Sequence, residues 1–148
     1  MKILLIHNQY KQAGGEDAVF HAESDLFSQY GHDVEKLEYD NSSIKTFADI
    51  FLSGIKTIYN PDSARTLETK IRNFNPDIIH VHNFLPLVSP SVFFVAKKYG
   101  IPVILTLHNY RLICPSATLF FQGRIYEKSI RSIFPLGAIR KGIYRNSK

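Results

Sequence analysis

Short apolar runs alternate with segments of helical period along most of the chain. Four runs rich in β-branched residues have the length of strands, and they are Ile3 to Ile6, Val34 to Tyr39, Ile78 to Val81 and Val103 to Leu107. Because the runs are nearly continuous in apolar character, they are typical of strands that are covered on both faces. The pattern therefore predicts a parallel sheet with helices on either side.

Helical segments fill the gaps between these runs. After the first run, Gly31 is placed to end a helix whose apolar residues recur at helical spacing, namely Val19, Ala22, Leu26 and Tyr30. After the third run, Ser89-Pro90 offers a capping side chain followed by proline at the first helical position, and Gly100 closes the helix. Both segments are predicted to be helices that connect neighbouring strands.

Two more helical stretches are predicted between the second and third runs. Their apolar residues lie three or four positions apart: Phe47, Phe51, Ile55 and Ile58 in one, and Leu67, Ile71 and Phe74 in the other. Asn60-Pro61-Asp62 is predicted to separate the two stretches as a turn.

The regular alternation ends at Leu107. Beyond it, the sequence predicts a short hairpin about Gln122-Gly123 and a helix that begins near Pro135 and runs through Ile139 and Ile143. The order of the elements indicates the α/β class, with a doubly wound, mostly parallel, Rossmann-like sheet. At 148 residues, the chain has the size of one domain, 1–148.

The basic charge is concentrated at one end of the chain. Residues 1–123 contain 11 Lys and Arg against 12 Asp and Glu, whereas Arg124 to Lys148 contains 7 against 1. This last segment is suited to anionic lipid headgroups or phosphorylated substrates, and the alternative is a solvated helix face. The Phe and Tyr stripes lack interleaved basic residues, so no nucleic acid is expected as a partner.

Cysteine content and hydropathy indicate the compartment. Cys114 is the single cysteine, and no zinc-type Cys/His spacing accompanies it. His7-Asn8-Gln9 breaks the first apolar run before it reaches the length of a signal-peptide core, and no run approaches the ~20 apolar residues of a membrane span. We expect a cytoplasmic protein that the basic segment can bring to the inner face of the membrane.

The first candidate loop, QYKQAGGED, contains two adjacent glycines. Loops after parallel strands converge at one edge of a sheet, and Gly14 and Gly15 lie directly before a helix that begins at Glu16. Without Cβ atoms, the backbone there can approach an anion such as a diphosphate at the helix N-terminus. The alternative is a turn that needs positive φ, with Glu16 and Asp17 favouring the helix dipole.

Two further loops carry histidines. In IIHVHNF, His80 and His82 share one face of a strand and Asn83 follows; the spacing indicates no third ligand, so no metal site is predicted and hydrogen-bonded structure is the alternative. In TLHNYRLICP, His108 and Arg111 are suited to donate to negative charge on a leaving group. A hydrogen-bonded loop residue is the alternative for His108.

Taken together, these loops resemble a known family. The resemblance runs over nearly the whole chain and is carried by MKILLIHNQYKQAGGEDAVFHAESDLFSQYGHDV, PDIIHVHNFLPLVSPSVFFVAKKYGIPVILTLHNYRLICP and FPLGAIRKGIYRNS. These segments are similar, in the same order, to the N-terminal domain of the family 4 glycosyltransferases, which have the GT-B fold. The resemblance implies the acceptor-side domain of a retaining, hexosyltransferase-type enzyme of polysaccharide assembly. Such an enzyme moves a sugar from a nucleotide-diphosphate sugar donor to a glycan or lipid-linked acceptor.

The resemblance also implies roles for individual residues. It gives His108 the catalytic role at the reaction centre. The residues that it implies for substrate binding belong to the glycine loop, the acceptor-side loop and a neighbouring arginine: Gly14, Gly15, Glu16, His82, Asn83 and Arg111. Because the nucleotide sugar is a substrate and retention here is same-face attack, no cofactor and no metal is expected.

The second domain of the GT-B fold has no counterpart in residues 1–148. A C-terminal domain is therefore an expected partner, and the chain alone is expected to be inactive. The alternative function is a non-catalytic module that binds a membrane surface or a glycan-lipid through Arg124 to Lys148. A nucleotide-binding protein or hydrolase is a weaker hypothesis, because the chain has neither a Walker loop nor a nucleophile elbow.

Overall fold

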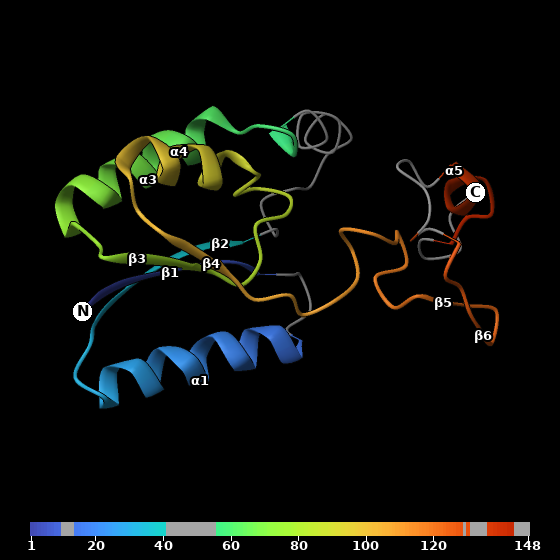
Figure 1. Ribbon diagram of the computed structural model, residues 1–148, viewed down its shortest axis with the longest axis horizontal. Helices are drawn as coiled ribbons and strands as arrows, with labels where there is room; N and C mark the ends of the chain where they lie inside the picture. Colours follow the sequence, from blue (N-terminus) through green and yellow to red (C-terminus); the bar gives the residue numbers. More distant parts are fainter. Residues whose placement is uncertain (10–13, 41–55, 129, 131–135, 144–148) are drawn as a thin grey trace. The chain divides into compact units, whose positions relative to one another are not determined.

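The computed structural model of the chain describes residues 1–9, 14–40, 56–128, 130 and 136–143 (Figure 1). The chain divides into two compact units, Met1–Thr106 and Leu107–Lys148. The first unit contains a sheet with its helices, and the second contains a hairpin and a short helix. The division falls where the alternation of strands and helices ends in the sequence.

A four-stranded parallel sheet forms the centre of the first unit. Its strands stand in the order β2-β1-β3-β4 and are β1 (Lys2–Gln9), β2 (Asp33–Asp40), β3 (Ile78–Val81) and β4 (Val103–Leu105). All three pairings are parallel, and Ile3 of the central strand β1 lies opposite Val34 and Ile78. The predicted Rossmann-like α/β class is confirmed, although the fourth strand ends at Leu105 instead of Leu107.

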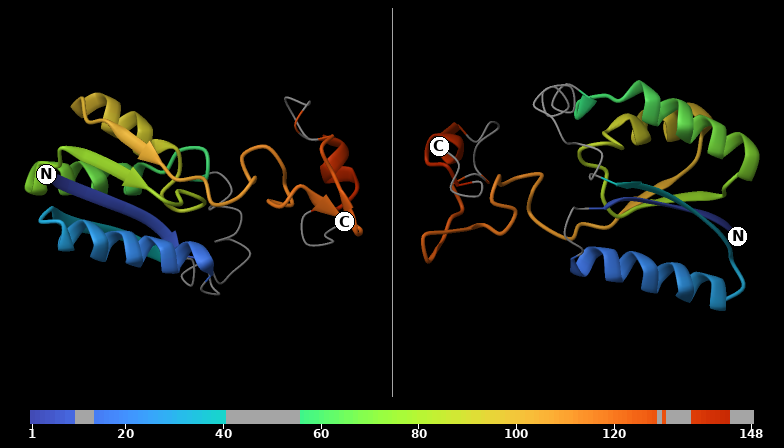
Figure 2. Two further views of the ribbon diagram at one scale, coloured as in Figure 1. Left: turned by 60° about the horizontal axis from the view of Figure 1, so that its bottom comes forward. Right: turned by 180° about the vertical axis from the view of Figure 1, so that it is seen from behind.

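Helices cover both faces of this sheet. α1 (Gly15–Gln29) lies on one face, whereas α3 (Pro61–Phe74) and α4 (Ser91–Tyr99) lie together on the other (Figures 1 and 2). The larger hydrophobic cluster lies between the sheet and the α3–α4 pair, and the smaller one lies beneath α1. This layered arrangement is the doubly wound architecture that the sequence predicts.

The two-residue period of the strands decides which side chains meet α1. Leu5 of β1 packs with Phe20 of α1, whereas Val81 of β3 belongs to the cluster under α3 and α4. His80 and His82 flank Val81 in β3 and its continuation, so they point to the opposite face. The fold thus brings two histidines beneath α1.

The face that α1 presents to the sheet differs from its apolar stripe. The residues that recur at helical spacing are all exposed: Val19, Ala22, Leu26 and Tyr30. The buried residues are instead Asp17, Phe20 and Ser24. The sheet presents imidazole rings to this helix. Phe20 stacks on His7 with ring centroids 4.9 Å apart, and the Asp17 carboxylate forms a hydrogen bond with the same imidazole.

The start of α3 corrects a predicted turn. Asn60 Oδ1 accepts hydrogen bonds from the amides of Asp62 and Ser63 at 3.1 and 3.4 Å. With Pro61 at the first helical position, Asn60-Pro61-Asp62 is the capped first turn of the helix. The apolar residues predicted for this helix are buried, namely Leu67, Ile71 and Phe74.

Glycines end two helices as predicted. Gly31, which follows α1, has φ of 79°, and Gly100, the C-cap of α4, has φ of 68°. The predicted Ser89 cap of α4 is wrong by one residue: Pro90 is the N-cap and supplies no side-chain hydrogen bond, although Ser89 Oγ accepts a hydrogen bond from the Ser91 amide at 3.2 Å. The helix itself begins at Ser91, one residue after the position predicted.

The helical stretch predicted between the second strand and Asn60 lies mainly outside the described residues. Phe47, Phe51 and Ile55 belong to residues 41–55, which the structure does not describe. Ile58, the last residue of that prediction, lies in a turn and is exposed.

The second unit contains the predicted hairpin. β5 (Phe120–Phe121) pairs antiparallel with β6 (Arg124–Ile125) around Gln122 and Gly123, which have φ of 50° and 76°. These positive angles are typical of the tight turns that join two antiparallel strands. α5 (Leu136–Arg140) follows, and it ends before the predicted Ile143. Among the described residues, no helix combines the length and apolar character that a membrane crossing requires.

Candidate functional site

Gly14 and Gly15 lie at the N-terminus of α1, and both are exposed. Gly14 is the N-cap with φ of −124° and ψ of −176°, and neither glycine has positive φ. A Cβ on Gly14 would lie 3.9 Å from Asp17 Oδ2, and one on Gly15 would meet nothing within 4 Å. The fold itself therefore does not require glycine at either position, and a turn that needs positive φ does not explain the pair.

Asp17 fixes the first turn of α1 to the end of β1. Its Oδ2 accepts a hydrogen bond from the Gly14 amide at 2.6 Å, and its Oδ1 lies 2.8 Å from His7 Nε2. Burial raises the pKa of Asp17, but the Gly14 amide and His7 outweigh it and hold the pKa below its usual value of 3.8. Asp17 thus acts as a charged anchor beneath the glycine pair.

Asp17→Asn is expected to lower the free energy of unfolding by about 2 kcal/mol at pH 7, because buried hydrogen bonds to a charged group are lost. A carboxyl whose pKa is lowered by folding stabilises the protein above its unfolded pKa and loses that contribution as pH falls through the folded value. The difference between wild type and variant should therefore shrink below pH 3.8. Urea unfolding at pH 7 and pH 3 measures it, with Asp25→Asn on the exposed side of α1 as the control.

The ends of β1 and β3 are joined by asparagine side chains. Asn83 Nδ2 donates to the Asn8 carbonyl at 2.7 Å, and Asn83 Oδ1 accepts from the Leu85 amide at 3.2 Å. Asn8 Oδ1 in turn accepts from the Leu87 amide at 2.9 Å. Asn83 is therefore a buried scaffold residue of this edge, and its contact with substrate stays a prediction.

His82 and His80 lie beneath α1 with Glu23 between them and solvent. Glu23 Oε2 is 3.4 Å from His82 Nε2 and 3.5 Å from His80 Nδ1. The side chain of His82 is fully buried, and Phe20 packs edge-on against it at 5.4 Å between ring centroids. A carboxylate and two imidazoles are the chemical groups in this part of the chain that can hold a metal ion.

His108 and Arg111 belong to the second unit. His108 follows Thr106 by two residues and is half-buried, as is Arg111. The Arg111 amide donates to Asn109 Oδ1 at 2.9 Å, which fixes the turn that carries the guanidinium. Their contribution to a common site with the glycine pair stays a prediction.

Within the first unit, the sheet edge brings the remaining predicted residues together. Gly14, Gly15 and Glu16 form the start of α1, and the His7–Asp17 bridge ties that start to β1. The Asn8 amide donates to the Asn83 carbonyl at 3.0 Å, which ties β1 to the loop after β3. These loops therefore converge at the carboxyl edge of the sheet, where α/β folds bind their ligands.

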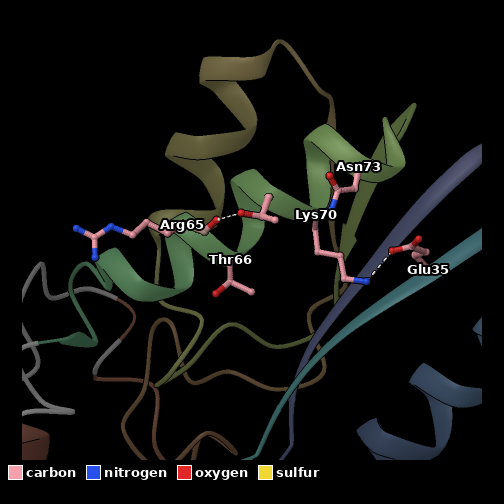
Figure 3. A pocket seen from close by; sticks show the side chains of 6 residues that line it. Glu35, Arg65, Thr66, Lys70 and Asn73 are labelled. Atoms are coloured by element: carbon pink, nitrogen blue, oxygen red, sulfur yellow. Dashed lines mark hydrogen bonds and ion pairs between the residues drawn. The ribbon is translucent and has the colours of Figure 1, made fainter.

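A hollow of about 460 Å³ lies elsewhere on the first unit, between α3 and the edge strand β2 (Figure 3). The Lys70 ammonium crosses it to Glu35 at 2.7 Å. None of the predicted site residues lines it; its lining consists of Glu35, Arg65, Thr66, Thr69, Lys70 and Asn73. Since α3 and α1 cover opposite faces, this hollow is separate from the glycine pair.

Three residues in this part of the first unit were not predicted from the sequence as parts of the site, namely His7, Asp17 and Glu23. Asp17 stands three residues after the N-cap Gly14, a spacing at which acidic side chains bind the N-cap amide, so this signal was present in the sequence. His7 and Glu23 carry no such local signal, because their partners are distant along the chain.

The fold and this edge define a Rossmann-like α/β unit with an exposed helix N-terminus at the carboxyl edge of its sheet. A model of the family described as Glycosyltransferase Family 4 matches residues 20–142. The chain therefore belongs to glycosyltransferase family 4, as its resemblance predicts.

One curated relative comes from Klebsiella pneumoniae and is described as an uncharacterized 42.6 kDa protein in a cps region. It is 40% identical over 76 residues, which cover 51% of this chain and 20% of that protein. The chain thus matches about a fifth of the relative's length. No solved structure matches the chain significantly.

Proposed function

We propose that this chain is the acceptor-side half of a retaining glycosyltransferase of the hexosyltransferase type. It transfers a sugar from a nucleotide-diphosphate donor to a glycan or lipid-linked acceptor. The observation that carries the proposal is the exposed pair Gly14-Gly15 at the N-terminus of α1, which the fold does not need for its own geometry. Where neither the backbone angles nor the packing of the fold requires glycine, the absence of a Cβ favours close approach of a ligand to the backbone.

The chemistry expected at this edge is stabilisation of the departing diphosphate. The amides of the first turn of α1 and the helix dipole favour an anion there. In the proposed mechanism, His108 and Arg111 donate hydrogen bonds to the charge that develops on the leaving group. The leaving diphosphate helps to take the proton of the acceptor on the same face, so the protein contributes positioning and electrostatic stabilisation.

The remaining predicted residues have supporting roles in this proposal. Glu16 stands in the first helical turn beside the glycines, and His82 and Asn83 support the acceptor side from the end of β3. The donor is a substrate, and the proposed mechanism uses no cofactor. The location of the Klebsiella pneumoniae relative in a cps region supports a role in polysaccharide assembly.

A C-terminal, nucleotide-sugar-binding domain is the partner that the proposal requires. The test is release of nucleoside diphosphate from a panel of UDP-, GDP- and dTDP-sugars by the enzyme that contains this domain, with retention checked by the anomeric configuration of the product. Residues 1–148 alone are expected to release none. Release by the isolated chain, or inversion in the product, would contradict the proposal.

A second proposal concerns an anionic membrane surface at the second unit. Large apolar side chains are exposed there beside basic ones: Phe120 and Ile125 face each other across the hairpin and are 52% and 75% exposed, and Arg124 is also exposed. Exposed apolar and basic groups in one small unit favour peripheral attachment at the inner face of the membrane.

Reversing the charge at Arg140 and Lys141 to glutamate is expected to weaken binding to phosphatidylserine vesicles at least ~10-fold, since each cation near the surface contributes about 1 kcal/mol. Both side chains are exposed. Co-sedimentation with anionic and neutral vesicles at low and high salt measures this. Lys97→Glu, at an exposed position of α4, is the matched control. Equal binding to anionic and neutral vesicles would contradict the proposal.

A further inference from the structure

Glu23, His80 and His82 bring three potential ligand atoms together beneath α1. The three donor atoms all lie within 4.8 Å of one another. The side chain of His82 is fully buried, that of His80 is 9% exposed, and that of Glu23 is 30% exposed. The group therefore has a buried side formed by the strand and an opening toward solvent at the carboxylate.

The two separations that involve Glu23 fit ligands of one ion better than direct hydrogen bonds. A hydrogen bond between a charged N–H and a carboxylate is about 2.7–2.9 Å long, and the His7–Asp17 contact in the same layer measures 2.8 Å. Glu23 Oε2 stands further away, at 3.4 and 3.5 Å from the two imidazole nitrogens. Two atoms that each lie about 2.1 Å from a tetrahedral zinc ion are about 3.4 Å apart.

The surroundings hold both imidazoles in place. His80 Nε2, the ring nitrogen remote from Glu23, lies 2.7 Å from Thr106 Oγ1, a contact that orients the ring. Phe27 packs near His80 at 6.1 Å between ring centroids, and Phe20 packs against His82 at 5.4 Å. An oriented imidazole within an apolar shell is the usual environment of a metal-binding histidine.

We propose that Glu23, His80 and His82 form a binding site for a divalent transition-metal ion of the zinc type. Two imidazole nitrogens and one carboxylate oxygen are a donor set that Zn²⁺ accepts, whereas Mg²⁺ and Ca²⁺ prefer oxygen ligands alone. The ion ties α1 to β3 and so fixes the helix whose first turn carries the glycine pair. The inference depends only on the Met1–Thr106 unit and is independent of the sugar-transfer proposal.

Zinc binding to the chain, freed of any affinity tag, tests the proposal. Zn²⁺ at about 100 times its dissociation constant is expected to raise Tm by roughly 5–10 °C. Isothermal titration calorimetry is expected to give one ion per chain, and Glu23→Gln and His82→Gln are each expected to weaken the affinity at least ~10-fold. Co²⁺ in the same site is expected to show visible absorption from nitrogen and oxygen ligands.

The matched control is His21→Gln, which removes an exposed histidine from the same helix and is expected to leave the zinc affinity unchanged. Glu23→Gln conserves the shape of the side chain, so the variant is expected to fold. Circular dichroism checks this and so distinguishes a loss of zinc binding from a loss of folding. Absence of a Tm rise in the wild-type chain would overturn the proposal. Equal affinity in wild type and Glu23→Gln, or an equal loss in His21→Gln, would also overturn it.

Discussion

Gly15→Val is expected to lower sugar transfer at least ~100-fold in the enzyme that contains this domain, while the unit itself stays folded. A valine side chain would occupy the space in front of the α1 amides, and displacement of a reactant by about 1 Å costs ~100-fold in rate. The free energy of unfolding should change by no more than about 1 kcal/mol. The space around a Cβ at Gly15 is open and its φ is not positive, so the side chain creates no strain.

The control is Gly31→Ala, for which the opposite result is expected: lower stability and unchanged transfer. Gly31 is also exposed and a Cβ there also meets nothing, but its φ of 79° disfavours any side chain. This variant should lose about 1 kcal/mol of stability with transfer unchanged. Steady-state transfer rates and urea unfolding of both variants measure the contrast. If Gly15→Val transfers sugar at the wild-type rate, the glycine pair does not approach the donor.

The sheet was predictable from the sequence because its signal is local. β3 occupies Ile78–Val81, the residues of the apolar run, and β1 and β2 extend their runs by only a few residues at the ends. Continuous β-branched runs followed by glycine-closed helices leave few alternatives to parallel pairing. With right-handed crossovers, the order β2-β1-β3-β4 places α1 on one face of the sheet and α3 and α4 on the other.

The orientation of α1 was not predictable in the same way. Its apolar stripe through Val19 and Leu26 is exposed, and the buried face carries Asp17 and Ser24 beside Phe20. Hydrophobic spacing identifies a helix but assumes that its partner surface is apolar. Here the partner surface combines apolar strand residues with imidazoles, so the buried face of α1 combines apolar packing with hydrogen bonds and ring stacking that only the tertiary structure reveals.

The residues of the candidate site were predictable where they belong to one short loop. They were not predictable where two separate elements contribute the neighbouring side chains. The glycine pair and the histidines at the end of β3 stand out as short motifs. Glu23 does not, because its relation to His80 and His82 exists only after α1 folds across the sheet. A third ligand from a distant helix has no fixed spacing in sequence, which is why the histidine pair alone predicted no metal site.

His108→Ala is expected to lower turnover ~100-fold or more in the enzyme that contains this domain, as loss of one preorganised hydrogen-bond donor does. The His108 imidazole would act on charge that develops only as the diphosphate leaves. The variant's kcat should therefore fall, while its KM for the nucleotide sugar changes little. Single-turnover transfer rates separate this loss from slower product release.

His32→Ala, which removes a half-buried histidine remote from the carboxyl edge, serves as the control and should transfer at the wild-type rate. Turnover of His108→Ala equal to wild type would remove this imidazole from the mechanism. A rise in KM alone would instead assign it to uniform substrate binding, because an interaction made equally in the ground state and the transition state leaves kcat unchanged.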